Sequence, residues 1–308
     1  MHSSMGSLLD GFSQVPDLVN RCKELGYKSA ALTDHGTLSS IVDLFQECKK
    51  ADIKAIAGCE LYVCDGSATD RTGENRGLSH LVVLCKNLAG WYELVKLVSM
   101  SNRKENMYYK PRVDYDMLKK YLGNGNHIAI SGHPGSTLAD SILGSDSYDA
   151  VDVDSARKCL PQNWKELATN CIDKHCDIFG AENFFVEIQL IDRQRLHMAE
   201  ILAECFREIV KESNGKYRPV ATADSHYVRK SDAIYQRILL CSSLHLTLPE
   251  VEYKIKSGKD IPLKGFFVSD NYHIPEFHEM EANHTVEELS NSILITEMCE
   301  NYNILSAP

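Results

Sequence analysis

Residues that commonly bind metal ions follow several short apolar segments of this 308-residue sequence. Asp34 and His35 come directly after Ala-Ala-Leu-Thr. Glu60 follows Ala-Ile-Ala-Gly-Cys, and His133 follows Ile-Ala-Ile-Ser-Gly. Imidazole and carboxylate groups are ligands for zinc, manganese and iron, and no cysteine cluster competes for that role here. The pattern therefore predicts a metal centre.

Further ligand-type residues extend this set. Asp224 and His226 lie two positions apart after Pro-Val-Ala-Thr, so in an extended strand both would project from one face and could bind one cation. Near the start of the chain, His2 and Asp10 flank the turn-like segment 3–9. His80 fits the pattern less well, because it precedes its apolar run and does not follow it.

Clustered divalent cations lower the pKa of a bridging water, polarise phosphoryl oxygens and stabilise both oxygens of an in-line displacement. The ligand types therefore favour hydrolysis of phosphoesters by a metal-activated hydroxide. Each histidine alone is more often an ordinary polar or capping residue. Seven or eight such residues over six strand ends argue against that interpretation, although spacing by itself does not show that they meet in space.

The elements that would position these residues alternate along the chain. Short runs rich in Val, Ile and Ala predict buried strands within residues 28–36, 53–63, 80–87, 127–134, 183–190 and 218–227. Apolar residues at helical spacing predict helices near 15–25, 41–48 and 202–210, the first bounded by Pro16 and Gly26. Strand followed by helix indicates a largely parallel α/β sheet, whose active sites lie at the carboxyl ends of its strands.

Composition limits the function. A formal charge of -10 and a pI near 5.6 argue against an extended basic surface, so any nucleic-acid substrate must be held locally. Eleven cysteines without a CxxC pair indicate a reducing compartment. Without a signal-like start or a run of 18 apolar residues, we expect a soluble cytoplasmic protein that does not use the membrane.

A second candidate site is the segment 108–112. Lys110 and Arg112 could hold a substrate phosphate while Tyr109 stacks on a base. An ordinary solvated loop with packing aromatics explains the same residues equally well. The segments 64–77 and 144–155 are polar and rich in Gly, Ser and Asp, which predicts loops.

A family resemblance covers nearly the whole chain. In order, its motifs are HSSMGSLLDG, LTDHG, GCELYV, SHLVVLCKN, YYKPRVD, ISGHPG, FFVEIQ and ATADSHY. They resemble the PHP (polymerase and histidinol phosphatase) domain, in the form found at the N-terminus of the bacterial DNA polymerase III alpha subunit. The resemblance implies a single domain over residues 1–308, a distorted (β/α)7 barrel. We expect its first strand to be truncated, a rim insertion at 144–160 and a peripheral segment at 245–308.

The same resemblance implies a site with two or three divalent ions, zinc, manganese or iron. The implied metal ligands are His2, Asp10, His35, Glu60, His80, His133, Asp224 and His226. Catalytic roles would fall on Asp10, His35, Asp224 and His226. Asp34 and Glu187 would support the ligands from behind.

One position departs from the family pattern, which begins His-x-His. Met1 occupies the middle position, so the first His has no counterpart. Three explanations are open: a truncated or misassigned start, a natural protein with a weakened site, or replacement of the lost ligand by the amine of Met1. We favour the first, because an open barrel would leave a strand edge unpaired.

The implied activity is 3′–5′ exonuclease action on DNA, of the proofreading type that accompanies replication. The partners would be a nucleic-acid 3′ end and a DNA polymerase. Two alternatives remain: a phosphatase for nucleotides or other small phosphoesters, and a catalytically weakened structural module of a replicative polymerase. Retention of eight ligand-type residues argues against the module, since charged groups are costly to bury for packing alone.

Overall fold

A computed structural model describes residues 4–72, 77–143 and 152–306. The strands are β1 (Ser29–Leu32), β2 (Lys54–Val63), β3 (Ser79–Cys85), β4 (Met107–Tyr108), β5 (Lys110–Val113), β6 (His127–Ile130), β7 (Phe184–Gln189) and β8 (Arg218–Thr222). Every strand expected from the apolar runs is confirmed. Met1 and His2 lie outside the described residues.

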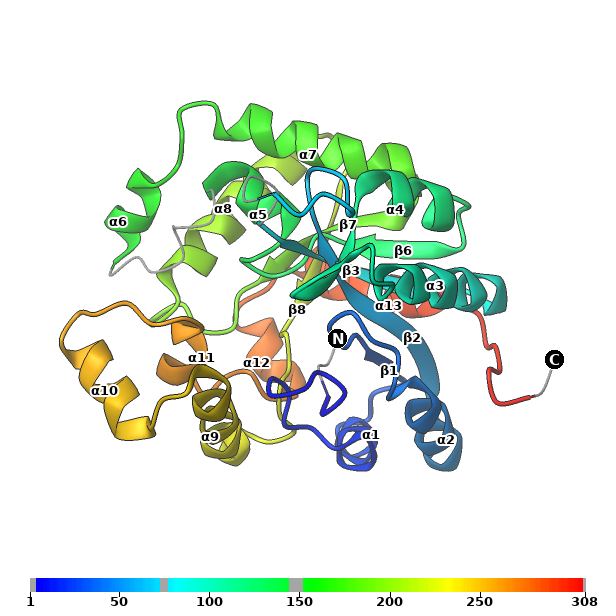
Figure 1. Ribbon diagram of the computed structural model, residues 1–308, viewed down its shortest axis with the longest axis horizontal. Coiled ribbons are helices and arrows are strands. Elements are labelled where there is room, and N and C mark those ends of the chain that lie inside the picture. Colours follow the sequence, from blue (N-terminus) through cyan, green and yellow to red (C-terminus); the bar gives the residue numbers. More distant parts are fainter. Residues whose placement is uncertain (1–3, 73–76, 144–151, 307–308) are drawn as a thin grey trace.

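Helices up to residue 212 precede or separate these strands, whereas the later helices follow the last strand (Figure 1). They are α1 (Val15–Glu24), α2 (Ile41–Ala51), α3 (Leu88–Ser101), α4 (Tyr115–Leu122), α5 (Thr137–Leu143), α6 (Val153–Lys158), α7 (Trp164–Phe179), α8 (His197–Glu212), α9 (Ala233–Leu244), α10 (Leu248–Lys256), α11 (Lys264–Val268), α12 (Phe277–Glu281) and α13 (Val286–Met298). Within the described residues, no helix has the length and apolarity needed to cross a membrane.

The first helix follows from its sequence as predicted. Val15, Leu18 and Cys22 recur at helical spacing and are buried, and Pro16 lies in the first turn, where its missing N–H is tolerated. Gly26 follows the helix with φ +76°, a conformation that favours glycine. By contrast, the loop expected at 144–155 is partly helical. Residues 144–151 lie outside the described part, but Asp152 caps α6 by accepting from Ser155 N at 2.7 Å.

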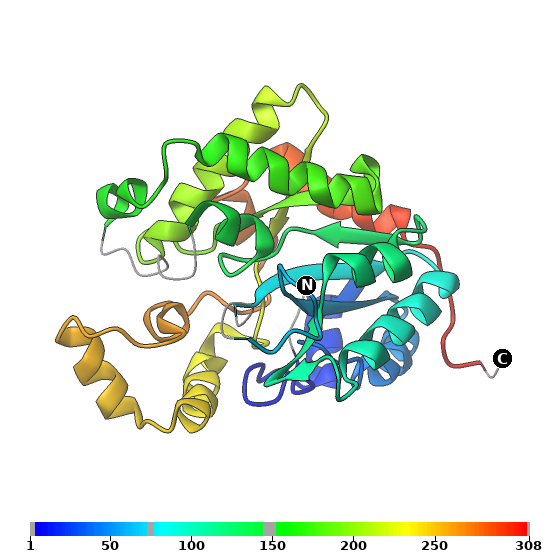
Figure 2. The ribbon, with the colours of Figure 1, turned by 45° about the horizontal axis from the view of Figure 1, so that its top comes forward.

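The strands form one sheet in the order β4-β5-β2-β3-β6-β7-β8, with β1 beside β2. The sheet curls into an incomplete barrel, which confirms the distorted barrel expected for a PHP domain (Figures 1 and 2). It is less parallel than the sequence suggests, because β3 runs antiparallel to both β2 and β6. The reason is that a loop without a helix joins β2 to β3 in the described residues, so the chain simply turns back.

Successive side chains along each strand point to opposite faces of the sheet, so the apolar core has two parts. Side chains on the outer face pack against α1, α2, α3, α7 and α8. Those on the inner face form a separate apolar cluster, to which α13 contributes Ile295 and Cys299: Ile56, Val82, Leu84, Ile128, Ile130, Phe185, Val220, Ile295 and Cys299. The C-terminal helix therefore packs inside the curl of the sheet.

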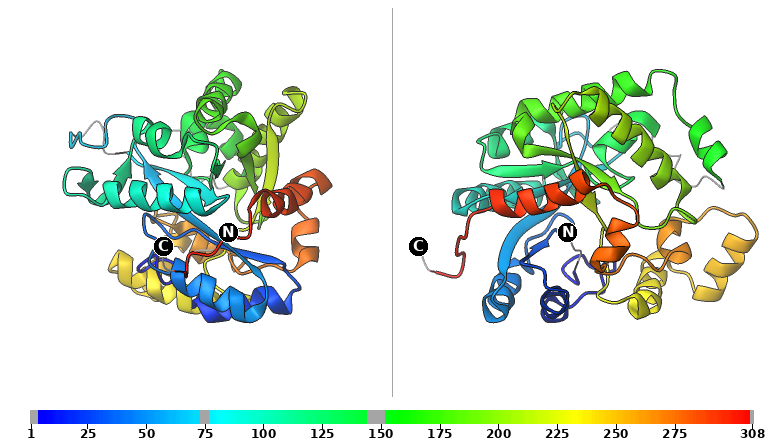
Figure 3. Two further views of the ribbon diagram at one scale, coloured as in Figure 1. Left: turned by 90° about the vertical axis from the view of Figure 1, so that its right-hand side faces the viewer. Right: turned by 180° about the vertical axis from the view of Figure 1, so that it is seen from behind.

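Helix α13 also spans the opening of the barrel. Among the described residues, β1 pairs only with β2, and β8 pairs only with β7. On the β8 side, Asn291 Nδ2 donates to Pro219 O at 2.7 Å. On the β2 side, Lys54 Nζ donates to Thr296 O at 2.9 Å and to Cys299 O at 2.7 Å. Figure 3 shows this helix lying across the back of the molecule, between the two ends of the sheet.

Candidate metal centre

Glu60 is the centre of a cluster of three imidazoles. Its Oε1 lies 2.8 Å from His80 Nδ1 and 2.9 Å from His133 Nε2. Its Oε2 lies 3.6 Å from His35 Nδ1. The carboxylate is 4% exposed, so these contacts form away from bulk water. Glu60 lies within β2, and not at its end as expected, because the strand continues to Val63 between β3 and β5.

A second group adjoins the first through His35. Asp10 Oδ2 lies 3.1 Å from His35 Nε2 and 3.3 Å from His226 Nε2. Asp224 Oδ1 lies 3.7 Å from His226 Nδ1, and the same ring nitrogen lies 2.7 Å from the Asp224 backbone oxygen. The Asp10–His35–His226 and His35–Glu60–His80 groups each place three ligand atoms within 4.8 Å of one another.

His80 reaches this cluster because β3 is antiparallel. In a parallel sheet, a residue that begins a strand would lie at the opposite edge from residues that end one. Since β3 reverses direction, its first residues lie beside the last residues of β2, and His80 pairs in register with Tyr62. The residue that fitted the sequence pattern least therefore lies at the same rim as the others.

Asp224 and His226 meet by a different geometry from the one expected. Strand β8 ends at Thr222, so the pair lies beyond it and not in an extended strand. Asp224 adopts φ +44°, an uncommon conformation for a non-glycine residue. The chain turns there, and Phe12 N donates to His226 O at 2.7 Å, which fastens the segment to the loop that carries Asp10.

Asp34 holds the loop that carries Asp10 through hydrogen bonds to its serines. Its carboxylate accepts from Ser4 N at 2.7 Å, from Ser4 Oγ at 2.8 Å and from Ser7 Oγ at 3.1 Å. Ser7 Oγ in turn accepts from His35 N at 3.0 Å. Gly6 has no room for a side chain, because a Cβ would overlap Asp34 Oδ2. Asp34 thus connects the Asp10 loop to the backbone of His35.

Charges inside the cluster oppose the effect of burial. Burial raises the pKa of Asp10, but His226 and His35 lower it well below its usual range. Burial lowers the pKa of His226, yet Asp10 and Asp224 raise it to about 10. In the same way Glu60 raises the pKa of His133 to about 9 against burial. The cluster is therefore a balanced array of charges, of the kind that functional sites concentrate.

Glu187 lies behind the cluster and is 3% exposed. Thr222 Oγ1 donates to its Oε1, while its Oε2 has no hydrogen-bond partner within the described structure. Burial, followed by the charge of Asp224, raises the pKa of Glu187 to about 7. Its position fits a supporting residue more closely than a ligand.

The segment 108–112 lies apart from this cluster. Arg112 is 1% exposed and donates to Ala68 O at 2.6 Å, so its guanidinium faces the protein interior. Tyr109 is 81% exposed. Lys110 lies over the ring of Tyr62, which stacks on His35. None of the three lines the cavity described next. Substrate binding there stays a prediction.

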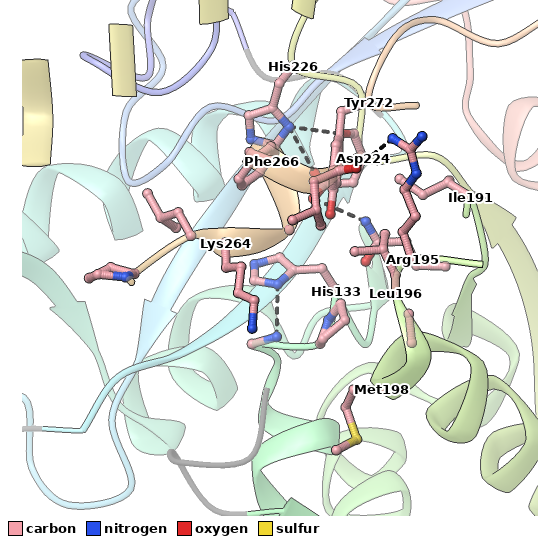
Figure 4. A pocket seen from close by; sticks show the side chains of 18 of the residues that line it. His133, Ile191, Arg195, Leu196, Met198, Asp224, His226, Lys264, Phe266 and Tyr272 are labelled. Atoms are coloured by element: carbon pink, nitrogen blue, oxygen red, sulfur yellow. Dashed lines mark hydrogen bonds and ion pairs between the residues drawn. The ribbon is translucent and has the colours of Figure 1, made fainter. Parts of the chain in front are cut away.

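A cavity of about 620 Å³ opens from the cluster. At one end it is lined by Asp10, His35, His80, His133, Asp224 and His226. Its other walls come from the end of β7 with Gln189, from residues 191–199 and from residues 260–272. Arg195, Leu196, Lys264, Phe266 and Tyr272 of these walls are labelled in Figure 4. No pattern in the sequence singled out Gln189, Lys264 or Phe266, because they join the site only through the fold.

The donor set fits divalent metal ions. Seven of the eight expected ligands form one continuous network, and His2 is the eighth, outside the described residues. Carboxylate oxygens and imidazole nitrogens lie close enough to share cations. Buried His35 Nδ1 has no hydrogen-bond partner in the described part of the chain, as expected of a nitrogen reserved for another ligand.

Comparison with known proteins matches the chain to one family. Residues 1–190 match the PHP domain family. The chain is 30% identical to the DNA polymerase III alpha subunit of Treponema pallidum over 97% of its length, and 31% identical to that of Thermus aquaticus over 96%. It spans only 23% and 22% of those two proteins. A solved amidohydrolase from Chromobacterium violaceum, with bound sulfate and no metal, has a TM-score of 0.42 and 12% identity over 73% of this chain and 86% of its own.

Proposed function

Because the chain belongs to the PHP domain family, we propose that it is a metal-dependent phosphodiesterase that removes nucleotides from the 3′ end of DNA. One observation carries the proposal: the ligand-type residues of six separate segments form a single network that opens into a cavity. Zinc, manganese or iron would be held by Asp10, His35, Glu60, His80, His133, Asp224 and His226, with His2 as a further ligand.

Divalent cations bound there would supply an activated water and offset the negative charge of a phosphodiester. The protein's own groups complete the site. His226 Nδ1 donates to the Asp224 backbone oxygen, so Nε2, which faces Asp10, is the ring nitrogen left for a cation. A cation bound there would take the place of the proton that the raised pKa of His226 otherwise keeps on the ring. His35 belongs to both groups of ligands and connects them.

The test is degradation of a 5′-labelled single-stranded oligonucleotide after loading with Mn²⁺ or Zn²⁺. We expect a ladder of products shortened from the 3′ end. Release of phosphate from small esters without shortening would favour the phosphatase. A protein that binds no metal and is inert on both substrates would favour the structural module.

Glu60→Gln should lower the rate by about a hundredfold or more, because a neutral amide no longer attracts cations at the centre of the cluster. Glu93→Gln is the matched control. Glu93 also faces a histidine, with Oε2 3.8 Å from His127 Nδ1, but it lies outside the cavity. Equal loss in the two variants would contradict the assignment.

A further inference from the structure

The half of the cavity away from the metal ligands has its own chemistry. Arg195 precedes α8 on one wall, and Lys264 begins α11 on the other. In Figure 4 both side chains lie among the residues around the cavity. In a protein of net charge -10, two cationic groups beside a metal centre mark a place suited to phosphate.

The two walls are fastened to each other. Arg195 Nη1 donates to Val268 O at 2.7 Å. Ser269 Oγ donates to Asp192 Oδ2 at 2.8 Å, and Asn271 Nδ2 donates to the same oxygen at 3.1 Å. These bonds join segments about 75 residues apart in the sequence. The cavity is therefore formed before any ligand enters, which lowers the entropic cost of binding.

Aromatic side chains line the cavity next to the ligand-type residue His226. Phe266 packs edge-on against His226, with ring centroids 4.5 Å apart, and against Tyr272 at 4.3 Å. Ile191 and Leu196 belong to the same apolar cluster. Flat apolar side chains in such a position favour a nucleobase, because every base has an aromatic face.

Gln189 provides a separate indication that a ligand binds here. Its side chain lines the cavity, and the residue is only 8% exposed. Its Nε2 donates to Asp224 Oδ2 at 3.2 Å, which orients the amide. Its Oε1 has no hydrogen-bond partner among the described residues. A buried acceptor without a donor is costly, and a hydroxyl of a bound sugar would satisfy it.

We propose that this cavity holds the 3′-terminal nucleotide of the substrate. Its base lies against Phe266, its 3′-hydroxyl donates to Gln189 Oε1, and its phosphate contacts Lys264 and Arg195 beside the metal ligands. This proposal rests on the proposed phosphodiesterase function and adds the substrate's terminal nucleotide as the recognised unit. A volume of about 620 Å³ suits a ligand of that size.

Binding of the product nucleotide tests the subsite separately from catalysis. The probe is thymidine 5′-monophosphate, titrated calorimetrically into the Mn²⁺-loaded protein. Lys264→Met should weaken binding about tenfold, because it removes a charged donor and keeps the length of the side chain. Lys264→Arg should stay within about threefold of the original protein. Lys259→Met is the control, since Lys259 is exposed and outside the cavity.

The proposed contact between the base and Phe266 is tested by comparing ligands with and without a base. Deoxyribose 5-phosphate lacks the base, so the original protein should bind it about tenfold less tightly than thymidine 5′-monophosphate. Phe266→Leu should reduce that preference. An unchanged preference would show that the base does not lie on Phe266 and would overturn this part of the proposal.

The outcomes separate the two proposals. If the protein shortens oligonucleotides but Lys264→Met binds the nucleotide normally, the subsite is wrong and the phosphodiesterase function stands. If nucleotide binding depends on Lys264 but no oligonucleotide is cleaved, the subsite stands and the function is wrong. Failure of the original protein to bind the nucleotide overturns the subsite.

Discussion

Glu187 is buried close to the histidine cluster, yet it makes no ion pair within the described residues. Burial and the charge of Asp224 together raise the pKa of the Glu187 carboxyl to about 7. A negative charge at this position costs stability while no cation is present. Ionised Glu187 therefore lowers the stability of the metal-free fold, at a position close to the residues that would bind metal.

Glu187→Gln should stabilise the metal-free protein at pH 8. The pKa of Glu187 is raised from 4.5 to about 7 on folding, so the unfolded chain releases this proton first as the pH rises. Stability is lost between those two values, by up to about 3 kcal/mol. The variant should exceed the original protein by that amount at pH 8 and match it at pH 4, as measured by urea unfolding in the presence of a chelator. Glu166→Gln, at an exposed position, should show no such dependence.

At the scale of elements, two features shape the site. The reversal of β3 brings His80 to the rim where β1 and β2 present their ligands. Helix α13 spans the two ends of the open sheet and places Ile295 and Cys299 in the inner core. The strands that carry the ligands are thus fixed relative to one another by a helix far along the sequence.

Lys54→Met should lower the free energy of unfolding by about 1–3 kcal/mol. The ammonium group donates to Thr296 O and Cys299 O at the C-terminal end of α13, where a cation also interacts favourably with the helix dipole. Urea denaturation measures the change. Lys49→Met, on the exposed face of α2, should stay within about 0.5 kcal/mol of the original protein. Equal midpoints for the two variants would show that α13 does not brace the sheet.

At the scale of the whole molecule, the acidic charge and the cluster are connected. The formal charge is -10, and each divalent cation that binds would make it less negative by two. In the proposed function, attraction for a phosphodiester would therefore come from the metal-loaded centre and from Arg195 and Lys264, and not from the general surface.

Metal binding should stabilise the fold. At a free Mn²⁺ concentration 100 times the dissociation constant, unfolding should require about 2.7 kcal/mol more, because the cation binds only the folded protein. Thermal unfolding with and without a chelator measures the effect. Asp10→Asn should lose most of it, since Asp10 contacts both His35 and His226. The same stabilisation in Asp10→Asn would place the metal elsewhere.

The sequence by itself determined the residue types of the site, the strands that carry them and the family. Ligand-type residues next to apolar runs are local features, so His35, Glu60 and His133 could be identified without coordinates. The i, i+2 spacing of Asp224 and His226 also indicated a pair, although the assumed extended geometry was wrong.

Only the tertiary structure decided how these residues meet. Strand direction is set by pairing between distant segments, so His80 at the start of β3 could not be placed from its own neighbourhood. The wall formed by Gln189, Arg195, Lys264 and Phe266 depends on bonds between segments about 75 residues apart. Such contacts leave no periodic pattern in the sequence, because each residue's role depends on what lies across the cavity from it.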